Sequence, residues 1–143
     1  MKIRIKRIDG SIPLPEYKTA GSAGFDLASR ERVEIPSKEL ALVPLNVIVD
    51  LPDGHMLMLA ARSSLPKKGL LLANGVGIGD CDFCGEDDEY KALVYNFTDK
   101  PVIIEKGERV AQGIIFAIEQ AEFEEVEQIG QPTRGGFGST GKF

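Results

Sequence analysis

The chain has 143 residues, of which 43% are hydrophobic and 27% charged, and these values are ordinary for one soluble globular domain. The formal net charge of −5 argues against a nucleic-acid partner held by bulk electrostatics. No stretch approaches the roughly 18 apolar residues that a membrane span needs, and residues 1–7 alternate charged with aliphatic side chains, unlike a signal peptide. We therefore expect a cytoplasmic protein with no nucleic-acid or membrane partner. A polyanionic ligand would have to be bound by a local cluster of cationic side chains and N–H groups.

Most of the chain has the periodicity of short β-strands. In chain order, the predicted strands are residues 2–7, 33–35, 40–49 with a break at Pro44, 56–60, 90–97, 110–118 and, at an edge, 122–126. Only residues 63–68 have the composition of a helical turn, and this turn is short. The sequence predicts an all-β domain, a jelly-roll-like barrel or sandwich of many short strands with one short helical turn.

The C-terminal end of the chain differs in composition from the rest. Residues 131–143 read QPTRGGFGSTGKF, with four glycines and the aromatic Phe137 in the middle. This composition is typical of a disordered terminus. An alternative interpretation is that a glycine-rich strip carrying Arg134 and Phe137 closes over a flat, anionic ligand. We therefore divide the chain into a β domain, residues 1–129, and a flexible Gly-rich arm, residues 130–143.

Three shorter segments combine small residues with polar side chains. Residues 23–27 read AGFDL and place Asp26 in a turn, where a carboxylate often caps its own backbone. Residues 62–65 read RSSL and present a guanidinium, hydroxyls and N–H groups together, which suits an anion, although either serine is also a good helix N-cap. Residues 107–112 read GERVAQ; Glu108 and Arg109 are expected to pair across this turn, and Gln112 needs a partner on an otherwise apolar strand.

The longest polar segment, residues 74–85, reads NGVGIGDCDFCG. Glycines at alternate positions let another molecule approach the backbone, whose N–H and C=O groups can read the edge of a planar base. Asp80 and Asp82 flank the turn, where either carboxylate could orient water or bind a metal. A plain Gly/Asp hairpin with a solvated face is the alternative.

The two cysteines, Cys81 and Cys84, have the C-x-x-C spacing of redox pairs and of half zinc sites. Tetrahedral zinc needs about four ligands, and besides these thiols the chain offers only the distant His55 as a soft or borderline ligand. A redox motif usually opens a helix, whereas this one lies in an Asp- and Gly-rich stretch. We interpret the pair as two free thiols in a reducing compartment.

Taken together and in this order, the motifs AGFDL, RSSL, NGVGIGDCDFCG, GERVAQ and RGGFGSTG resemble those of the trimeric dUTPase family over nearly the whole chain. The resemblance implies a jelly-roll-like domain that forms a homotrimer with active sites between subunits. It also implies hydrolysis of dUTP to dUMP and pyrophosphate with Mg²⁺, a reaction that limits uracil incorporation into DNA and supplies dUMP for thymidylate synthesis.

The resemblance also assigns residues. Asp80 would activate the water that attacks the α-phosphorus, and Asp26 would support Mg²⁺ through ordered water. The implied phosphate-binding residues are Arg62, Ser63, Ser64, Gln112, Arg134, Ser139 and Thr140. The implied uracil and deoxyribose pocket consists of Asn74, Gly77, Ile78, Phe83 and Phe137, with the Phe137 ring stacking over uracil as the arm closes.

This chain departs from the family pattern at three places. Gly79 replaces an aliphatic residue, which we expect to loosen the strand that carries Asp80. Phe83 replaces the usual tyrosine under the deoxyribose, and the arm has two residues fewer between Arg134 and Phe137. Two alternatives stay open: a dCTP deaminase, including a bifunctional form, which shares the fold and the RSSL stretch, and a non-catalytic relative that senses nucleotides or binds a protein.

Overall fold

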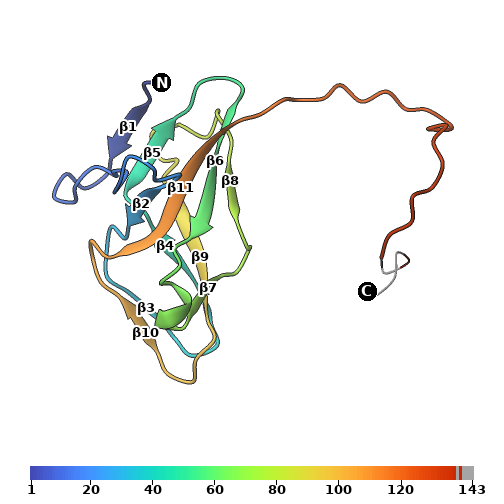
Figure 1. The fold of residues 1–143 in the computed structure, drawn as a ribbon. Helices are drawn as coiled ribbons and strands as arrows, with labels where there is room; N and C mark the ends of the chain where they lie inside the picture. Colours follow the sequence, from blue (N-terminus) through green and yellow to red (C-terminus); the bar gives the residue numbers. More distant parts are fainter. Residues whose placement is uncertain (138, 140–143) are drawn as a thin grey trace.

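The computed structural model describes residues 1–137 and 139 (Figure 1). Those residues form antiparallel β-strands and one short 3-10 turn, with no α-helix among them. The strands are β1 (Arg4–Arg7), β2 (Phe25–Ala28), β3 (Val33–Ile35), β4 (Leu40–Pro44), β5 (Val47–Asp50), β6 (His55–Ala61), β7 (Leu70–Leu72), β8 (Gly77–Gly79), β9 (Lys91–Asn96), β10 (Val102–Ile104) and β11 (Arg109–Ala117); the 3-10 turn η1 is Pro66–Lys68.

Two sheets enclose the core. A four-stranded sheet has the order β2-β11-β6-β8 and a three-stranded sheet has the order β4-β9-β7, while β1 pairs with β5 and β10 pairs with β3. Side chains alternate across each strand, so Leu57 and Leu59 of β6 and Ala92 and Val94 of β9 point inward into one buried cluster. The polar side chains at the alternate positions of β2 and β11 therefore lie on the outer face of the four-stranded sheet.

The all-β prediction is confirmed, and the strands with the longest alternating patterns were predicted well. Residues 90–97 and 110–118 correspond to β9 and β11, and the break at Pro44 separates β4 from β5, with Asn46 between them at φ 67°. The predicted helical turn within 63–68 appears as η1. Strands β2, β7, β8 and β10, of three or four residues each, were not predicted, although β1 and β3, of the same lengths, were.

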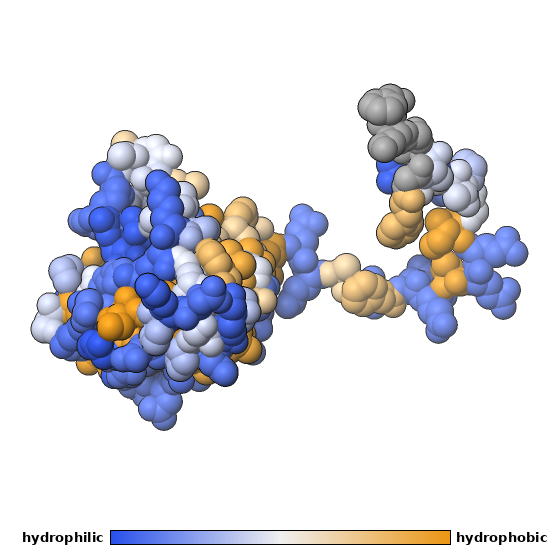
Figure 2. Space-filling model, turned by 90° about the horizontal axis from the view of Figure 1, so that it is seen from below, coloured by the Kyte–Doolittle hydropathy of each residue, from blue (hydrophilic) through white to orange (hydrophobic). Residues whose placement is uncertain are grey.

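The predicted edge strand at 122–126 is wrong. Its residues are exposed and belong to no strand, because the chain there has no neighbouring strand to pair with. Figure 1 shows the chain after β11 running away from the body as an extended arm. In Figure 2 hydrophobic side chains lie along this arm clear of the body, and Phe123 is 94% exposed. Among the described residues, no helix is long and apolar enough to cross a membrane.

Candidate active site

A cluster of charged side chains lies where β2, β6 and β11 meet. Asp26 of β2 is opposite Gln112 of β11, and Arg62 follows the end of β6. Arg62 donates from Nε to Asp26 Oδ1 at 2.7 Å, and Arg109 donates from Nη1 to Asp26 Oδ2 at 2.9 Å. One carboxylate thus holds two guanidinium groups side by side, which leaves an excess of positive charge suited to a phosphate chain.

Gln112 has the partner that its place on an apolar strand required. Its Nε2 donates to the carbonyl oxygen of Ala61 at 2.9 Å, and its Oε1 lies so near Gly24 that a Cβ there would be 2.9 Å away. Gly24 therefore has a packing reason to be glycine. The register of β11 against β2 shifts between Arg109 and Ala111, and this irregularity is of the kind that re-aims side chains beside functional sites.

Ser63 and Ser64 lie in the exposed turn after β6. Neither side chain caps the 3-10 turn, whose N-cap is Leu65 without a side-chain hydrogen bond. The Ser64 hydroxyl accepts a long hydrogen bond of 3.4 Å from Arg62 Nη1. A cavity of about 500 Å³ lies beside this turn, and its cationic lining residues are Arg62, Lys67, Lys68 and Arg109.

The expected pairing of Glu108 with Arg109 is wrong. Arg109 pairs with Asp26, whereas Glu108 pairs with Lys68 at 2.6 Å and accepts a hydrogen bond from the Glu105 backbone N–H. Glu108 directly precedes β11 and Arg109 is the first residue of that strand, so their side chains point in different directions.

The segment predicted to read a base forms an edge of the four-stranded sheet. Strand β8 pairs with β6 on one side, and no strand of the described residues pairs with its other side. Backbone N–H and C=O groups on that free side are available to a ligand. Gly75 at φ 73° makes the turn that leads into β8.

Asp80 follows β8 directly and is exposed. It lines a second cavity of about 500 Å³ together with Asn74, Gly77, Ile78 and Phe83. The structure thus brings together the predicted catalytic residue and the predicted base and sugar residues of the body of the domain. Phe83, which is 38% exposed, presents part of its ring to this cavity.

The expectation that Gly79 loosens this strand is wrong. Gly79 is buried, and a Cβ placed on it would lie 2.6 Å from Tyr90 Cζ and closer still to Tyr90 Cε1 and the phenolic oxygen. A Cβ at Gly77 would likewise lie 3.1 Å from Leu59 Cβ. Gly79 is therefore required by the Tyr90 ring, which fills the space that an aliphatic residue at 79 would occupy, and at Gly77 a side chain would fit only if Leu59 shifted slightly.

The base and phosphate clusters line separate cavities in this chain, because β6 and β11 lie between β8 and β2. Arg134, Phe137 and Ser139 belong to the arm and line neither cavity, and Phe137 is fully exposed. Thr140 lies outside the described residues. Both Cys81 and Cys84 are free thiols, and burial raises the pKa of Cys84.

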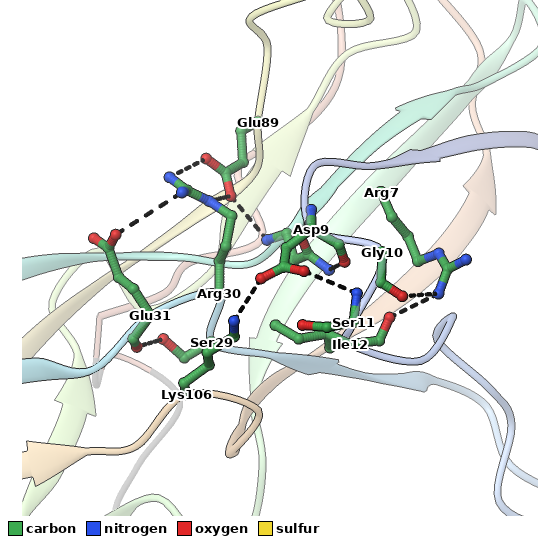
Figure 3. Close-up of polar contacts among 11 residues, drawn as sticks. Arg7, Asp9, Gly10, Ser11, Ile12, Ser29, Arg30, Glu31, Glu89 and Lys106 are labelled. Atoms are coloured by element: carbon green, nitrogen blue, oxygen red, sulfur yellow. Dashed lines mark hydrogen bonds and ion pairs between the residues drawn. The ribbon is translucent and has the colours of Figure 1, made fainter.

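An ion-pair network anchors the segment between Asp80 and β9 to the rest of the fold (Figure 3). Glu89 accepts hydrogen bonds from Arg30 Nε and Nη2 at 2.8 and 3.1 Å and from the backbone N–H of Asn46 at 2.9 Å. Asn46 in turn bonds to the backbone of Asp9 in both directions. Asp9 pairs with Lys106 at 2.6 Å, and this hydrogen bond, together with that from Ser11, holds the pKa of Asp9 well below its usual range.

The sequence analysis did not identify two residues of the site. These are Arg109, which pairs with Asp26, and Tyr90, which lines the cavity of Asp80. Arg109 carried a weak signal, as the second guanidinium next to a glycine-containing turn. Tyr90 carried none, because in sequence an aromatic residue directly before β9 looks like any other core residue.

The fold and these two clusters define an all-β domain with an exposed edge strand beside one cavity and a cationic turn beside another. A model of the dUTPase family matches residues 10–141. The deoxyuridine 5'-triphosphate nucleotidohydrolase of Wolinella succinogenes is 39% identical over 99% of this chain and 95% of its own length, and that of Fusobacterium nucleatum is 38% identical over 99% of both. The chain belongs to the dUTPase family.

Solved structures agree with this assignment. The crystal structure of a dUTPase from Streptococcus mutans superposes with a TM-score of 0.77 at 35% identity, covering 83% of this chain and 98% of that one. The dUTPase of Staphylococcus bacteriophage 80alpha with dUPNHPP superposes with a TM-score of 0.86 at 25% identity over 99% of both chains. The predicted jelly-roll fold is thereby confirmed.

Proposed function

We propose that this chain is a dUTP diphosphatase, which hydrolyses dUTP to dUMP and pyrophosphate with Mg²⁺. The observation that carries the proposal is the place of Asp80, directly after an edge strand and in one cavity with Asn74 and Phe83. Membership of a family whose curated members carry this activity in their names supports the same reaction. The reaction removes dUTP before uracil can enter DNA and supplies dUMP for thymidylate synthesis.

Uracil would bind along the free side of β8. Its alternating donor and acceptor groups match backbone C=O and N–H groups of residues 74–78, whereas the amino group of cytosine would face a donor. The methyl group of thymine would meet the backbone of an edge strand, which cannot move aside because β6 holds it. The Phe83 ring would lie under the deoxyribose and leave no room for a 2′-hydroxyl.

Asp80 would orient a water molecule and accept its proton as the oxygen attacks the α-phosphorus. The bond between the α-phosphorus and the bridging oxygen of the β-phosphate then breaks, and pyrophosphate leaves. An exposed carboxylate at the mouth of the cavity is free to do this, since it has no ion-pair partner among the described residues.

The charge of the triphosphate would be met by Arg62 together with Ser63, Ser64 and Gln112. The described residues hold no cluster of three carboxylate, imidazole or thiol groups for a metal. Mg²⁺ commonly keeps several waters and takes phosphate oxygens as ligands, so an ion that arrives with the substrate fits this site. Both carboxylate oxygens of Asp26 accept hydrogen bonds from arginines, so Asp26 would contact Mg²⁺ only through water. The bound ion would neutralise negative charge on the phosphates.

A homotrimer would complete the site. The base and phosphate clusters line separate cavities within one chain, so a neighbouring subunit is needed to bring one cluster opposite the other. The arm, residues 130–143, would then close over the bound nucleotide, with Phe137 over uracil and Arg134, Ser139 and Thr140 near the outer phosphates. Two free thiols suit the reducing cytoplasm in which we place the enzyme.

The experiment that tests the proposal is pyrophosphate release from dUTP, dTTP, dCTP and UTP, each with Mg²⁺ and with a chelator. We expect release from dUTP with Mg²⁺ and little from the other three nucleotides. Formation of dUTP or dUMP from dCTP would instead identify a dCTP deaminase. Tight binding of dUTP without release of pyrophosphate would identify a nucleotide-sensing relative.

A further inference from the structure

Tyr90 is the residue of this site whose chemistry is unexplained. It is 5% exposed, and its phenolic oxygen is the one buried side-chain polar atom of the described residues without a hydrogen-bond partner. A buried hydroxyl left unpaired carries a desolvation cost that no hydrogen bond offsets. A phenylalanine would avoid this cost, so the position of the ring itself needs a reason.

The ring lies between the catalytic strand and the sugar-facing aromatic. One edge contacts Gly79, at a distance that excludes every side chain larger than hydrogen at that position. The ring of Phe83 meets it edge to face, with centroids 5.4 Å apart and planes at 84°. Such pairs have a preferred geometry, so the orientation of one ring constrains that of the other.

Tyr90 has little freedom to move. Its carbonyl oxygen accepts from the Leu45 N–H at 2.9 Å and its N–H donates to the Val47 carbonyl at 3.0 Å. The preceding residue, Glu89, is fixed by Arg30 and Asn46 in the network of Figure 3. The ring is therefore a rigid support against which Gly79 and Phe83 are placed.

The electrostatic environment keeps the phenol neutral. Burial, with smaller contributions from the charges of Asp80 and Cys84, raises the pKa of Tyr90 to about 12. The ring can therefore lie behind Asp80 without adding a charge that would change how that carboxylate binds water.

We infer that Tyr90 is a positioning residue that sets the discrimination between deoxyribose and ribose, because its ring fixes the height and tilt of Phe83 in the sugar pocket. The inference rests on the proposed function. It assigns sugar selectivity to a pair of aromatic rings and to the glycine that makes room for the second ring. Neither ring can do this alone, since Phe83 is partly exposed and Tyr90 supplies its edge-to-face contact.

The test compares Tyr90→Val, Tyr90→Phe and the double variant Gly79→Val/Tyr90→Val. For each, kcat and KM are measured with dUTP and with UTP, and thermal unfolding is recorded. Tyr95→Val is the matched control, because it makes the same change at a half-buried position of β9, the strand that begins directly after Tyr90. Misplacing a substrate-positioning group by about 1 Å can cost on the order of a hundredfold in rate.

We expect Tyr90→Val to lower the ratio of kcat/KM for dUTP over UTP by about tenfold or more, whereas Tyr90→Phe and Tyr95→Val keep the wild-type ratio. The double variant refills the space, so it should regain the melting temperature while the ratio stays low. If Tyr90→Val is too unstable to assay, the double variant provides the measurement. A wild-type ratio in a folded Tyr90→Val or in the double variant would overturn the inference, as would an equal loss in Tyr95→Val. If the wild type does not hydrolyse dUTP, the proposed function fails, which is a separate result.

Discussion

Replacing Asp26 by asparagine tests whether one carboxylate organises the phosphate cluster. The substitution keeps the shape of the side chain and removes the charge that holds Arg62 at 2.7 Å and Arg109 at 2.9 Å. The side chains of Asp26 and Arg62 are 16% and 26% exposed, so their hydrogen bond is poorly screened, whereas Arg109 is 46% exposed. Both guanidinium groups would then lose their shared counter-charge.

The magnitude follows from these exposures. A hydrogen bond to a charged group contributes about 1.5–3 kcal/mol when screening is weak, and an exposed pair about 0–1 kcal/mol. We therefore expect Asp26→Asn to lower the free energy of unfolding by about 2–3 kcal/mol. For a chain of this size that corresponds to a fall in melting temperature of about 10 °C. A displaced Arg62 should also raise KM for dUTP by about tenfold, the equivalent of about 1.4 kcal/mol.

Thermal unfolding and steady-state kinetics with dUTP provide the two measurements. Asp53→Asn, a change of the same chemistry in the exposed turn before β6, is the control and should behave as the wild type. If Asp26→Asn has the melting temperature and the KM of the wild type, the carboxylate does not organise the two arginines, and the reasoning is refuted.

Three further predictions concern catalysis, the arm and pH. Asp80→Asn should bind dUTP with near wild-type affinity, measured by calorimetry, and lose turnover by orders of magnitude because the water loses its proton acceptor; near wild-type turnover would sink the assignment. Deletion of residues 132–143 should abolish most activity and leave the proposed trimer folded, as judged by light scattering and circular dichroism; an unfolded product would show that the arm is needed for folding. Asp9→Asn should be less stable than the wild type at neutral pH. Because the pKa of Asp9 is lower in the folded state, its stabilisation is complete above the unfolded pKa of about 4 and is lost as the pH falls further. The two melting temperatures should therefore converge in acid, and a constant difference would contradict this origin.

The alternation of apolar and polar side chains along the chain was sufficient to predict the longer strands. Residues 90–97 alternate between buried and outward side chains because β9 lies centrally in its sheet, with neighbours on both sides and a core on one face. The same rule failed at 122–126, where an alternating pattern meets no neighbouring strand. The same rule did not predict β7, β8 and β10, which have three residues each, although β3, of the same length, was predicted because turn residues bound it.

The sequence by itself determined the class of fold, the family and the residue types of the site, because motif order and glycine spacing are local properties of the chain. Only the tertiary structure decided which groups meet. Asp26 and Arg109 are 83 positions apart, and their ion pair exists because β2 and β11 are neighbours in one sheet. Likewise, Gly79 looked like a weak point until the ring of Tyr90 was found in the space that its missing side chain leaves. Packing of side chains from separate strands sets such contacts, and periodicity along one strand carries no information about them.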